Sequence, residues 1–389
     1  MSEWQKVNLG DCCEITSSKR IFFSEYVESG IPFYRSKEII EKGKGEEISH
    51  PLYISKEKYD EIKGKYGVPQ KGDLLLTAVG SLGIPFVVKD DSPFYFKDGN
   101  LVWLKHFQDI DSIFLYYWIK SENGYNALYN IAIGSAQKAL TIAAIKGYEI
   151  PLPPLQTQHR IATILSRYDS LIENYQKQIK LLEEAAQRLY KEWFIDLHFP
   201  GHEHTKIVDG VPEGWEMKKV GEIAIISAGG DKPDVVTEEQ TTECQVPIYS
   251  NGTTKEGLYG YTNKSSNTAG SITVSARGSI GFACLRMHDY FSIVRLISIK
   301  PQNNVDLMYL FQFTKVHTFM SNGAAQQQLT VPMVKAIDVV YPAESLLEAF
   351  ENVVLPLYKK VQSLQSQLRL LTEARDRLLP KLMSGEIAI

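Results

Sequence analysis

The sequence contains few cysteines and lacks the motifs of several common enzyme classes. Four cysteines occur among 389 residues, and no Cys-x2-Cys pair is present. This pattern argues against a disulfide framework and against a zinc site, and it favours a reduced, cytoplasmic protein. The phosphate-binding loop Gly-x4-Gly-Lys-Ser/Thr, the Asn-Pro-Pro-aromatic motif of amino-methyltransferases and a nuclease Asp with a following Glu-x-Lys are also missing. We therefore expect no catalytic residue, no metal and no cofactor in this chain.

Neither a long apolar run nor an excess of one charge is present. No stretch is long enough to span a bilayer, and the first residues lack the basic and apolar regions of a signal peptide, so no membrane association is expected. The net charge is −4 and the isoelectric point is about 6.1. A domain that binds nucleic acid by itself is usually basic. A DNA-binding role would therefore require a local basic surface or partner subunits that contact the phosphates.

Two long heptad seams, 189 residues apart, are the main feature of the sequence. Apolar residues recur at alternating spacings of four and three, which is typical of a coiled coil. We expect two long helices that pair antiparallel, with Pro356 interrupting the second near its start and kinking it. The first seam comprises Ile161, Leu165, Tyr168, Ile172, Tyr175, Ile179, Leu182, Ala186, Leu189 and Trp193. The second comprises Phe350, Val354, Leu357, Val361, Leu364, Leu368, Leu371, Arg375, Leu378 and Leu382, with Arg375 as the one interruption.

The segments outside the helices also repeat. Residues 72–83 match 270–281, both with a Gly-Ser-x-Gly turn, and residues 134–141 match 323–330, both with a Gln-containing turn. The predicted fold class is mixed α/β (α+β): two pseudo-repeated globular domains, 1–150 and 200–340, separated by two long antiparallel coiled-coil helices, 151–199 and 341–389. Within the domains we expect strands over 74–77, 101–104, 272–275 and 294–299, and helices over 113–120 and 306–315.

Three segments carry a resemblance to a known family. Pro151-Leu152-Pro153-Pro154-Leu155-Gln156-Thr157-Gln158 resembles the Pro-Pro-Leu-x-x-Gln opening of the conserved helix in the specificity subunits of type I restriction–modification systems. The end of the chain, 378–387, is similar to their C-terminus, and Pro212-Glu213-Gly214-Trp215 is similar to the start of their second target-recognition domain. The second helix departs from the pattern, because Tyr341-Pro342-Ala343-Glu344 lacks the second proline and the glutamine.

The resemblance implies a non-catalytic subunit that places two target-recognition domains, 1–150 and 200–340, on a bipartite site in double-stranded DNA. It also implies partners: two modification subunits, which use S-adenosylmethionine, and two restriction subunits, which translocate DNA and use ATP and Mg. The helices would act as spacers and docking surfaces. The docking residues on the helices are then expected to be Gln158, Ile161, Leu165, Tyr168, Phe350, Val354 and Leu357.

Polar and basic side chains in the loops are the candidates for contacts with DNA, because such groups read base edges and bind phosphates. A solvated turn is the alternative for the Gln-containing turns, and an internal salt bridge is the alternative for Arg277, whose counterpart in the first half is Val79. Thr141 and Thr330 are better explained as helix caps. The candidates are Arg35, Ser36, Lys37, Gln137, Lys138, Asn251, Arg277, Gln326 and Gln327.

Two other classes of function fit parts of the sequence. A two-lobed coiled-coil scaffold for protein interactions would share the helices and the repeats. An autonomous nuclease or methyltransferase with a degenerate active site would explain a DNA-binding surface, although the catalytic motifs are missing.

Overall fold

The computed structural model describes residues 4–134, 138–319, 328–387 and 389. The chain divides into two compact units. The first comprises Met1–Gln176 and Ser366–Ile389, and the second comprises Lys177–Gln365. The border between them falls inside both long helices, α7 (Leu155–Tyr190) and α11 (Glu344–Met383). None of the described helices is apolar over a length that would cross a membrane.

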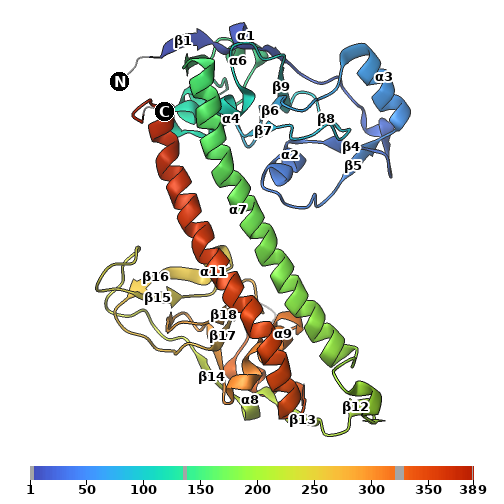
Figure 1. Ribbon diagram of the computed structural model, residues 1–389, viewed down its shortest axis with the longest axis vertical. Helices are drawn as coiled ribbons and strands as arrows, with labels where there is room; N and C mark the ends of the chain where they lie inside the picture. Colours follow the sequence, from blue (N-terminus) through green and yellow to red (C-terminus); the bar gives the residue numbers. More distant parts are fainter. Residues whose placement is uncertain (1–3, 135–137, 320–327, 388) are drawn as a thin grey trace. The chain divides into compact units, whose positions relative to one another are not determined.

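Two four-stranded sheets form the globular part of the first unit (Figure 1). One has the order β2 (Glu14–Thr16), β9 (Leu101–Lys105), β6 (Leu74–Thr77) and β7 (Pro85–Val87), and all its pairs are antiparallel. The other has the order β3 (Tyr26–Val27), β5 (Leu52–Ile54), β4 (Ile31–Tyr34) and β8 (Tyr95–Phe96). Its β4–β8 pair is parallel. All four residues of β6 are buried, as expected for a strand that reads Leu-Leu-Leu-Thr.

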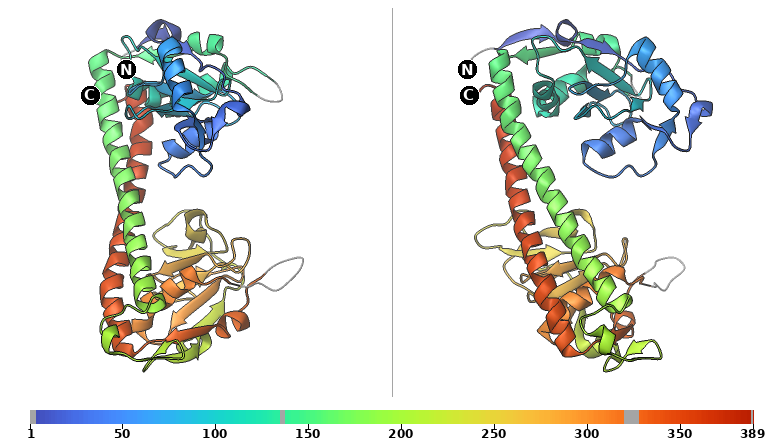
Figure 2. Two further views of the ribbon diagram at one scale, coloured as in Figure 1. Left: turned by 90° about the vertical axis from the view of Figure 1, so that its right-hand side faces the viewer. Right: turned by 45° about the vertical axis from the view of Figure 1, so that its right-hand side comes forward.

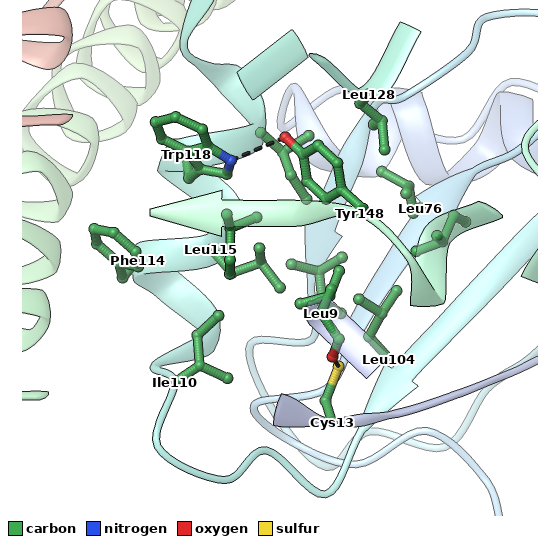
Figure 3. Packing of buried hydrophobic residues seen from close by; sticks show 14 of the residues in the cluster. Leu9, Cys13, Leu76, Leu104, Ile110, Phe114, Leu115, Trp118, Leu128 and Tyr148 are labelled. Atoms are coloured by element: carbon green, nitrogen blue, oxygen red, sulfur yellow. Dashed lines mark hydrogen bonds between the residues drawn. The ribbon is translucent and has the colours of Figure 1, made fainter. Parts of the chain in front are cut away.

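Helices cover these sheets and complete the core of the first unit. They are α1 (Leu9–Cys12), α2 (Ser36–Gly43), α3 (Lys56–Tyr66), α4 (Ser112–Lys120), α5 (Glu122–Asn130) and α6 (Ile142–Lys146), while β1 (Gln5–Asn8) pairs with β10 (Glu149–Leu152). Figure 3 shows Leu76 and Leu104 of the sheet and Leu115 of α4 among the side chains of one buried cluster. Two buried aromatic side chains also satisfy each other's polar groups in this core, because Trp118 Nε1 donates a hydrogen bond to the Tyr148 hydroxyl at 2.9 Å.

The second unit repeats this plan. Its four-stranded antiparallel sheet has the order β14 (Ala224–Ala228), β20 (Ile297–Pro301), β17 (Ser271–Val274) and β18 (Ala283–Arg286). A smaller sheet contains β16 (Leu258–Thr262), β15 (Val246–Tyr249) and β19 (Phe291–Ser292), again with one parallel pair. The remaining elements are β11 (Ile207–Val208), β12 (Val211–Pro212), β13 (Glu216–Lys219), α8 (Val220–Ile223), α9 (Leu307–Val316), α10 (Val331–Lys335) and β21 (Asp338–Tyr341).

The heptad seams form the predicted antiparallel pair. Every predicted seam position is buried or half-buried. In the first unit, Ile161 near the start of α7 belongs to the same core as Leu382 near the end of α11. In the second unit, Tyr190 at the end of α7 shares a core with Phe350 near the start of α11. Figures 1 and 2 show the two helices side by side within each unit. Apolar stripes that each helix could not bury alone are covered by the other helix.

The interruption of the second seam has a structural explanation. Arg375 Nη1 lies 2.7 Å from the carboxylate of Asp169 on α7, and the Tyr117 hydroxyl of α4 donates to the same carboxylate at 2.7 Å. Both charged side chains are about four-fifths covered. A cation at this seam position is therefore paired with an anion on the facing helix, an arrangement that favours one register over its alternatives.

Two details differ from expectation. Helix α11 continues without a break across Pro356, so the predicted interruption is wrong, while the kink at this proline stays a prediction. The strand expected over 294–299 begins later, at Ile297, because Val294 and Arg295 have φ angles of 53° and 60°. Left-handed backbone of this kind ends an extended strand and forms a turn.

A buried carboxyl group lies at the N-terminus of α9 in the second unit. Glu351 of α11 is 9% exposed and accepts a hydrogen bond from the backbone N–H of Met308 at 2.8 Å. Burial raises the pKa of Glu351 to about 7 and nearby Asp306 contributes to the rise, whereas the Met308 N–H and Lys359 oppose it. The folded protein therefore retains this proton at a pH where the unfolded chain, with an ordinary pKa of 4.5, has lost it.

We expect the stability of the second unit to fall as the pH rises from about 4.5 to 7, because only the folded state binds the proton in that range. At about 1.4 kcal/mol per pKa unit the loss above pH 7 is at most about 3 kcal/mol. Glu351→Gln keeps an acceptor oxygen for Met308 and should raise the thermal midpoint clearly at pH 8 and much less at pH 5. The exposed Glu348→Gln is the control, and equal effects of the two substitutions would contradict this origin of the pH dependence.

Candidate functional site

The two Gly-Ser-x-Gly turns have the same backbone shape in both units. Strand β6 leads into the turn 80–83, and β17 leads into the turn 278–281. Gly80 and Gly83 have φ angles of 79° and 75°, and Gly278 and Gly281 have 67° and 86°. Side chains other than glycine rarely adopt this left-handed region, which explains why glycine occupies both ends of the turn.

The Gln-containing turns are attached to these glycine turns by the same main-chain bond in each unit. The backbone N–H of Leu140 donates to the carbonyl of Ala78 at 2.9 Å, and the N–H of Leu329 donates to the carbonyl of Ala276 at 2.9 Å. In the first unit, a β-bridge between Val79 and Ala139 extends the contact. The structure thus brings together, twice, two sequence motifs that lie 62 residues apart in the first unit and 53 in the second. Gln137, Gln326 and Gln327 lie outside the described residues.

In the second unit, exposed Arg277 and half-buried Gln328 lie side by side and are bonded to each other. Arg277 Nη2 donates to Gln328 Oε1 at 2.9 Å. The salt bridge that the sequence left open as an alternative is not formed with any carboxylate in the described part of the chain. The guanidinium group therefore has donors left for a ligand, since a single hydrogen bond uses one of its five N–H groups.

In the first unit the position equivalent to Arg277 is Val79, which carries no charge, and Lys138 provides the cation instead. Its Nζ lies 3.7 Å from the centre of the Tyr129 ring, and Tyr129 stacks on Tyr125 with ring centres 6.1 Å apart. Tyr125 also lies next to the glycine turn. A Cβ atom placed on Gly83 would be 3.5 Å from the Tyr125 ring. Both tyrosines are 41% exposed. These two tyrosines were not among the residues predicted from the sequence, although two tyrosines four residues apart on a helix give a detectable signal.

Arg35, Ser36 and Lys37 lie at the start of α2, beside the base of the same turn. Ser36 Oγ donates to the carbonyl of Asn100 at 3.3 Å, and that carbonyl also accepts the backbone N–H of Ala78 at 2.8 Å. Arg35 forms an ion pair with buried Glu38. Burial by itself would raise the pKa of Glu38, but the hydrogen bonds from Arg35 lower it, so the pair stays charged. The Lys37 Nζ is 3.6 Å from Glu41 and is largely exposed.

Asn251 connects its loop to the turn that carries Arg277. Its side-chain oxygen accepts the backbone N–H of Ala276 at 2.7 Å, and its amide nitrogen donates to the carbonyl of Val294 at 2.6 Å. Both ends of the amide are thus engaged inside the unit, and contact with DNA by this side chain stays a prediction. Thr141 caps α6 as predicted, accepting from the Ala144 N–H at 3.1 Å, whereas Thr330 occupies the cap position of α10 without a side-chain bond.

The residues predicted to dock partner subunits are used within the chain. Ile161, Leu165, Phe350 and Val354 are at most 1% exposed, and Tyr168 and Leu357 are half-buried. Gln158 is fully buried; its oxygen accepts from the Asp111 N–H at 2.8 Å and its nitrogen donates to the carbonyls of Asp109 and Pro153. Docking by these seven residues stays a prediction, and in the structure their side chains hold the helices in place.

The described residues contain no group of three or more His, Cys, Asp or Glu side chains arranged to hold a metal ion. The four cysteines are all free and buried. The surface around the paired turns instead offers amide, hydroxyl, guanidinium and ammonium groups together with exposed tyrosine rings. Such groups can bind phosphates and read base edges.

Comparisons with known proteins agree with this chemistry. The family model for the type I restriction modification DNA specificity domain matches residues 1–184 and 212–345 of this chain. The chain is 27% identical over 345 residues to the type I restriction enzyme MjaIX specificity subunit of Methanocaldococcus jannaschii, which covers 82% of this chain and 78% of that protein. It is 34% identical over 193 residues to a putative type I restriction enzyme specificity subunit of Haemophilus influenzae, covering 49% of this chain and 46% of that protein.

The fold has a counterpart among solved structures. The crystal structure of the S subunit of a type I restriction–modification system from M. genitalium superimposes with a TM-score of 0.69 at 20% identity, covering 97% of this chain and 96% of that one. The matched family domain occurs twice along the chain, once in each repeat. The chain belongs to the family of type I restriction–modification DNA specificity subunits, and its part in such a system is DNA recognition and not catalysis.

Proposed function

We propose that this chain recognises a bipartite target in double-stranded DNA, with one half-site read by domain 1–150 and the other by domain 200–340. The observation that supports this most directly is the duplicated pair of turns. Each unit carries a Gly-Ser-x-Gly turn bonded to a Gln-containing turn, with a cation, Lys138 or Arg277, at its surface. Two equivalent polar surfaces in one chain are what a two-part DNA site requires.

The helices 151–199 and 341–389 are proposed to set the gap between the half-sites. Helix α7 has 36 residues, which corresponds to about 54 Å at 1.5 Å per residue. B-DNA rises about 3.4 Å per base pair, so two sites held by a stiff spacer of this size are read at one preferred gap. The Arg375–Asp169 pair supports this role, because it opposes sliding of one helix along the other.

The outer faces of the helices are proposed to dock two modification subunits and two restriction subunits in the cytoplasm. In this assignment S-adenosylmethionine binds to the modification subunits, ATP and Mg to the restriction subunits, and none of them to this chain. The duplicated helices support a stoichiometry of two, because pseudo-symmetric copies of one surface bind two copies of one partner. Co-purification with a methyltransferase chain would test the docking separately from the DNA target.

A methylome of the host, with this gene intact and with it deleted, tests the bipartite target. We expect one methyladenine motif to disappear on deletion, consisting of two short half-sites at a fixed gap, and to return when the gene is restored. A methylome that is unchanged while the gene and its partner methyltransferase are expressed would contradict the proposal. The protein-scaffold alternative makes a different prediction, since its binding would be insensitive to salt, whereas affinity for DNA falls steeply with salt concentration.

A further inference from the structure

The first unit carries an apolar tip that the packing of the chain does not explain. The side chains of Phe22 and Phe23 are 61% and 86% exposed, the two highest values among the phenylalanines of the described residues. Two adjacent phenylalanines in water are costly, because each leaves a large apolar area unburied. Exposed groups of this kind usually mark a surface that another molecule covers.

The tip is held in a fixed position. The carboxylate of Glu25 accepts the backbone N–H of Phe22 at 2.7 Å and is itself bound by Lys58 Nζ at 2.9 Å. The Phe23 ring packs edge-on against Tyr26 with ring centres 5.6 Å apart. Because these contacts fix the turn, the two phenylalanines lose little further freedom when they bind.

A basic cavity of about 590 Å³ adjoins the tip. Arg20, Arg35 and Lys97 line it together with the two phenylalanines and Asn100, and Asp98 is the one acid in its wall. Arg20 is paired with Asp98 at 2.8 Å but stays largely exposed, and Arg35 is paired with Glu38, so Lys97 is the cation of this lining without a carboxylate partner among the described residues. The wall continues into the candidate recognition surface, because the Asn100 carbonyl binds both Ser36 and the backbone of Ala78. An occupant with negative charge and flat apolar faces matches this lining, and nucleotides of DNA have both.

The second unit has an apolar pair at the same place in its fold. In the first unit two residues separate the tip from β3, which pairs with β5 at the edge of the sheet β3–β5–β4–β8. In the second unit Thr237 pairs with β16 at the equivalent edge, and the two residues before it, Val235 and Val236, are 43% and 40% exposed. A basic residue precedes each pair within three positions, Arg20 in one unit and Lys232 in the other.

We propose that the Phe22–Phe23 tip inserts against a base step at the half-site read by domain 1–150, and that the adjoining cavity receives the displaced nucleotide. The inference rests on the proposed function and adds to it a distortion of the DNA. Apolar side chains that enter between base pairs unstack them, and neighbouring cations bind the phosphates that the distortion brings closer. Recognition in this half then includes how readily the step deforms, in addition to contacts with base edges.

The test uses the full chain assembled with its methyltransferase subunit, on DNA of the sequence that the methylome identifies. The adenine analogue 2-aminopurine, which fluoresces more strongly when unstacked, replaces single bases across the first half-site. We expect a several-fold increase at one step with the natural chain. Phe22→Ala with Phe23→Ala should abolish that increase and weaken binding roughly tenfold or more, while leucine at both positions should retain most of it.

Ile113→Ala is the matched control, because Ile113 is an exposed apolar residue of the same unit outside the cavity. It should leave both the fluorescence and the affinity unchanged. The proposal is overturned if the natural complex binds its target without any fluorescence increase in the first half-site, or if the double alanine variant binds and unstacks the DNA normally. A natural complex that fails to bind the bipartite target specifically would refute the proposed function instead. Unchanged thermal midpoints would show that the variants fold.

Discussion

Replacing Gln158 with alanine is expected to lower the free energy of unfolding of the first unit by about 3 kcal/mol or more. The substitution leaves three backbone groups without the side chain that binds them: the N–H of Asp111 and the carbonyls of Asp109 and Pro153. Gln158 is fully buried. Each unsatisfied buried group costs roughly 1–3 kcal/mol, and the lost side chain adds a cavity. Thermal or denaturant unfolding of the full chain measures the effect.

Gln156→Ala is the matched control for this prediction. Gln156 lies in the same first turn of α7 but is exposed, so its loss should change stability by about 0.5 kcal/mol or less. The comparison also separates the two roles assigned to Gln158. If Gln158 contacted a partner directly, its alanine variant would keep a normal unfolding midpoint and lose the modification subunit. A lowered midpoint, with the subunit still bound below it, supports the structural role.

Replacing Arg286 with methionine is expected to destabilise the second unit by about 3 kcal/mol and to abolish recognition of one half-site only. Arg286 is 2% exposed; its guanidinium group donates to Thr273 Oγ1 at 2.9 Å and to the Glu256 carbonyl at 2.6 Å, and it stacks 3.5 Å from the centre of the Tyr249 ring. Methionine fills part of the volume but leaves these acceptors unpaired.

The loss of recognition follows from what Arg286 supports. Lys255 and Glu256 have φ angles of 48° and 55°, a conformation that costs energy for residues other than glycine and is kept only by surrounding contacts. The Glu256 contacts of Arg286 supply them, and the same loop carries Asn251 beside the Arg277 turn. Lys360→Met, an exposed cation of α11, is the control for lost charge. A methylome in which both half-sites become relaxed, or neither does, would contradict the local role of Arg286.

The repeats and the heptad seams could be predicted from the sequence because both are periodic signals. The seam positions and the strand at 74–77 follow from spacing and composition alone, and matching motifs identified the turns in both units. The partners of polar residues could not be found in this way. Asp169 meets Arg375 across 206 positions of the chain, and nothing near either residue in the sequence marks the other.

The candidate site was predictable to a similar degree. The two glycine turns follow strands β6 and β17 as predicted. Asn251 and Gln158 show why the sequence could not separate polar residues with partners inside the chain from those that bind another molecule. A polar side chain in a loop looks the same in the sequence whether its hydrogen bonds go to its own backbone or to DNA. Only the three-dimensional positions of Ala276 and Val294 reveal that both ends of the Asn251 amide are engaged.

The main-chain attachment of each Gln-containing turn has a consequence for how new specificities arise. The bonds from Leu140 to Ala78 and from Leu329 to Ala276 join backbone atoms, and backbone atoms are common to all residue types. Side-chain substitutions in these segments therefore remove neither bond, and the two segments can vary independently of each other. Under the function proposed above, one half of the target can then change at a time while the chain continues to fold, and the DNA target can change without passing through an unstable intermediate.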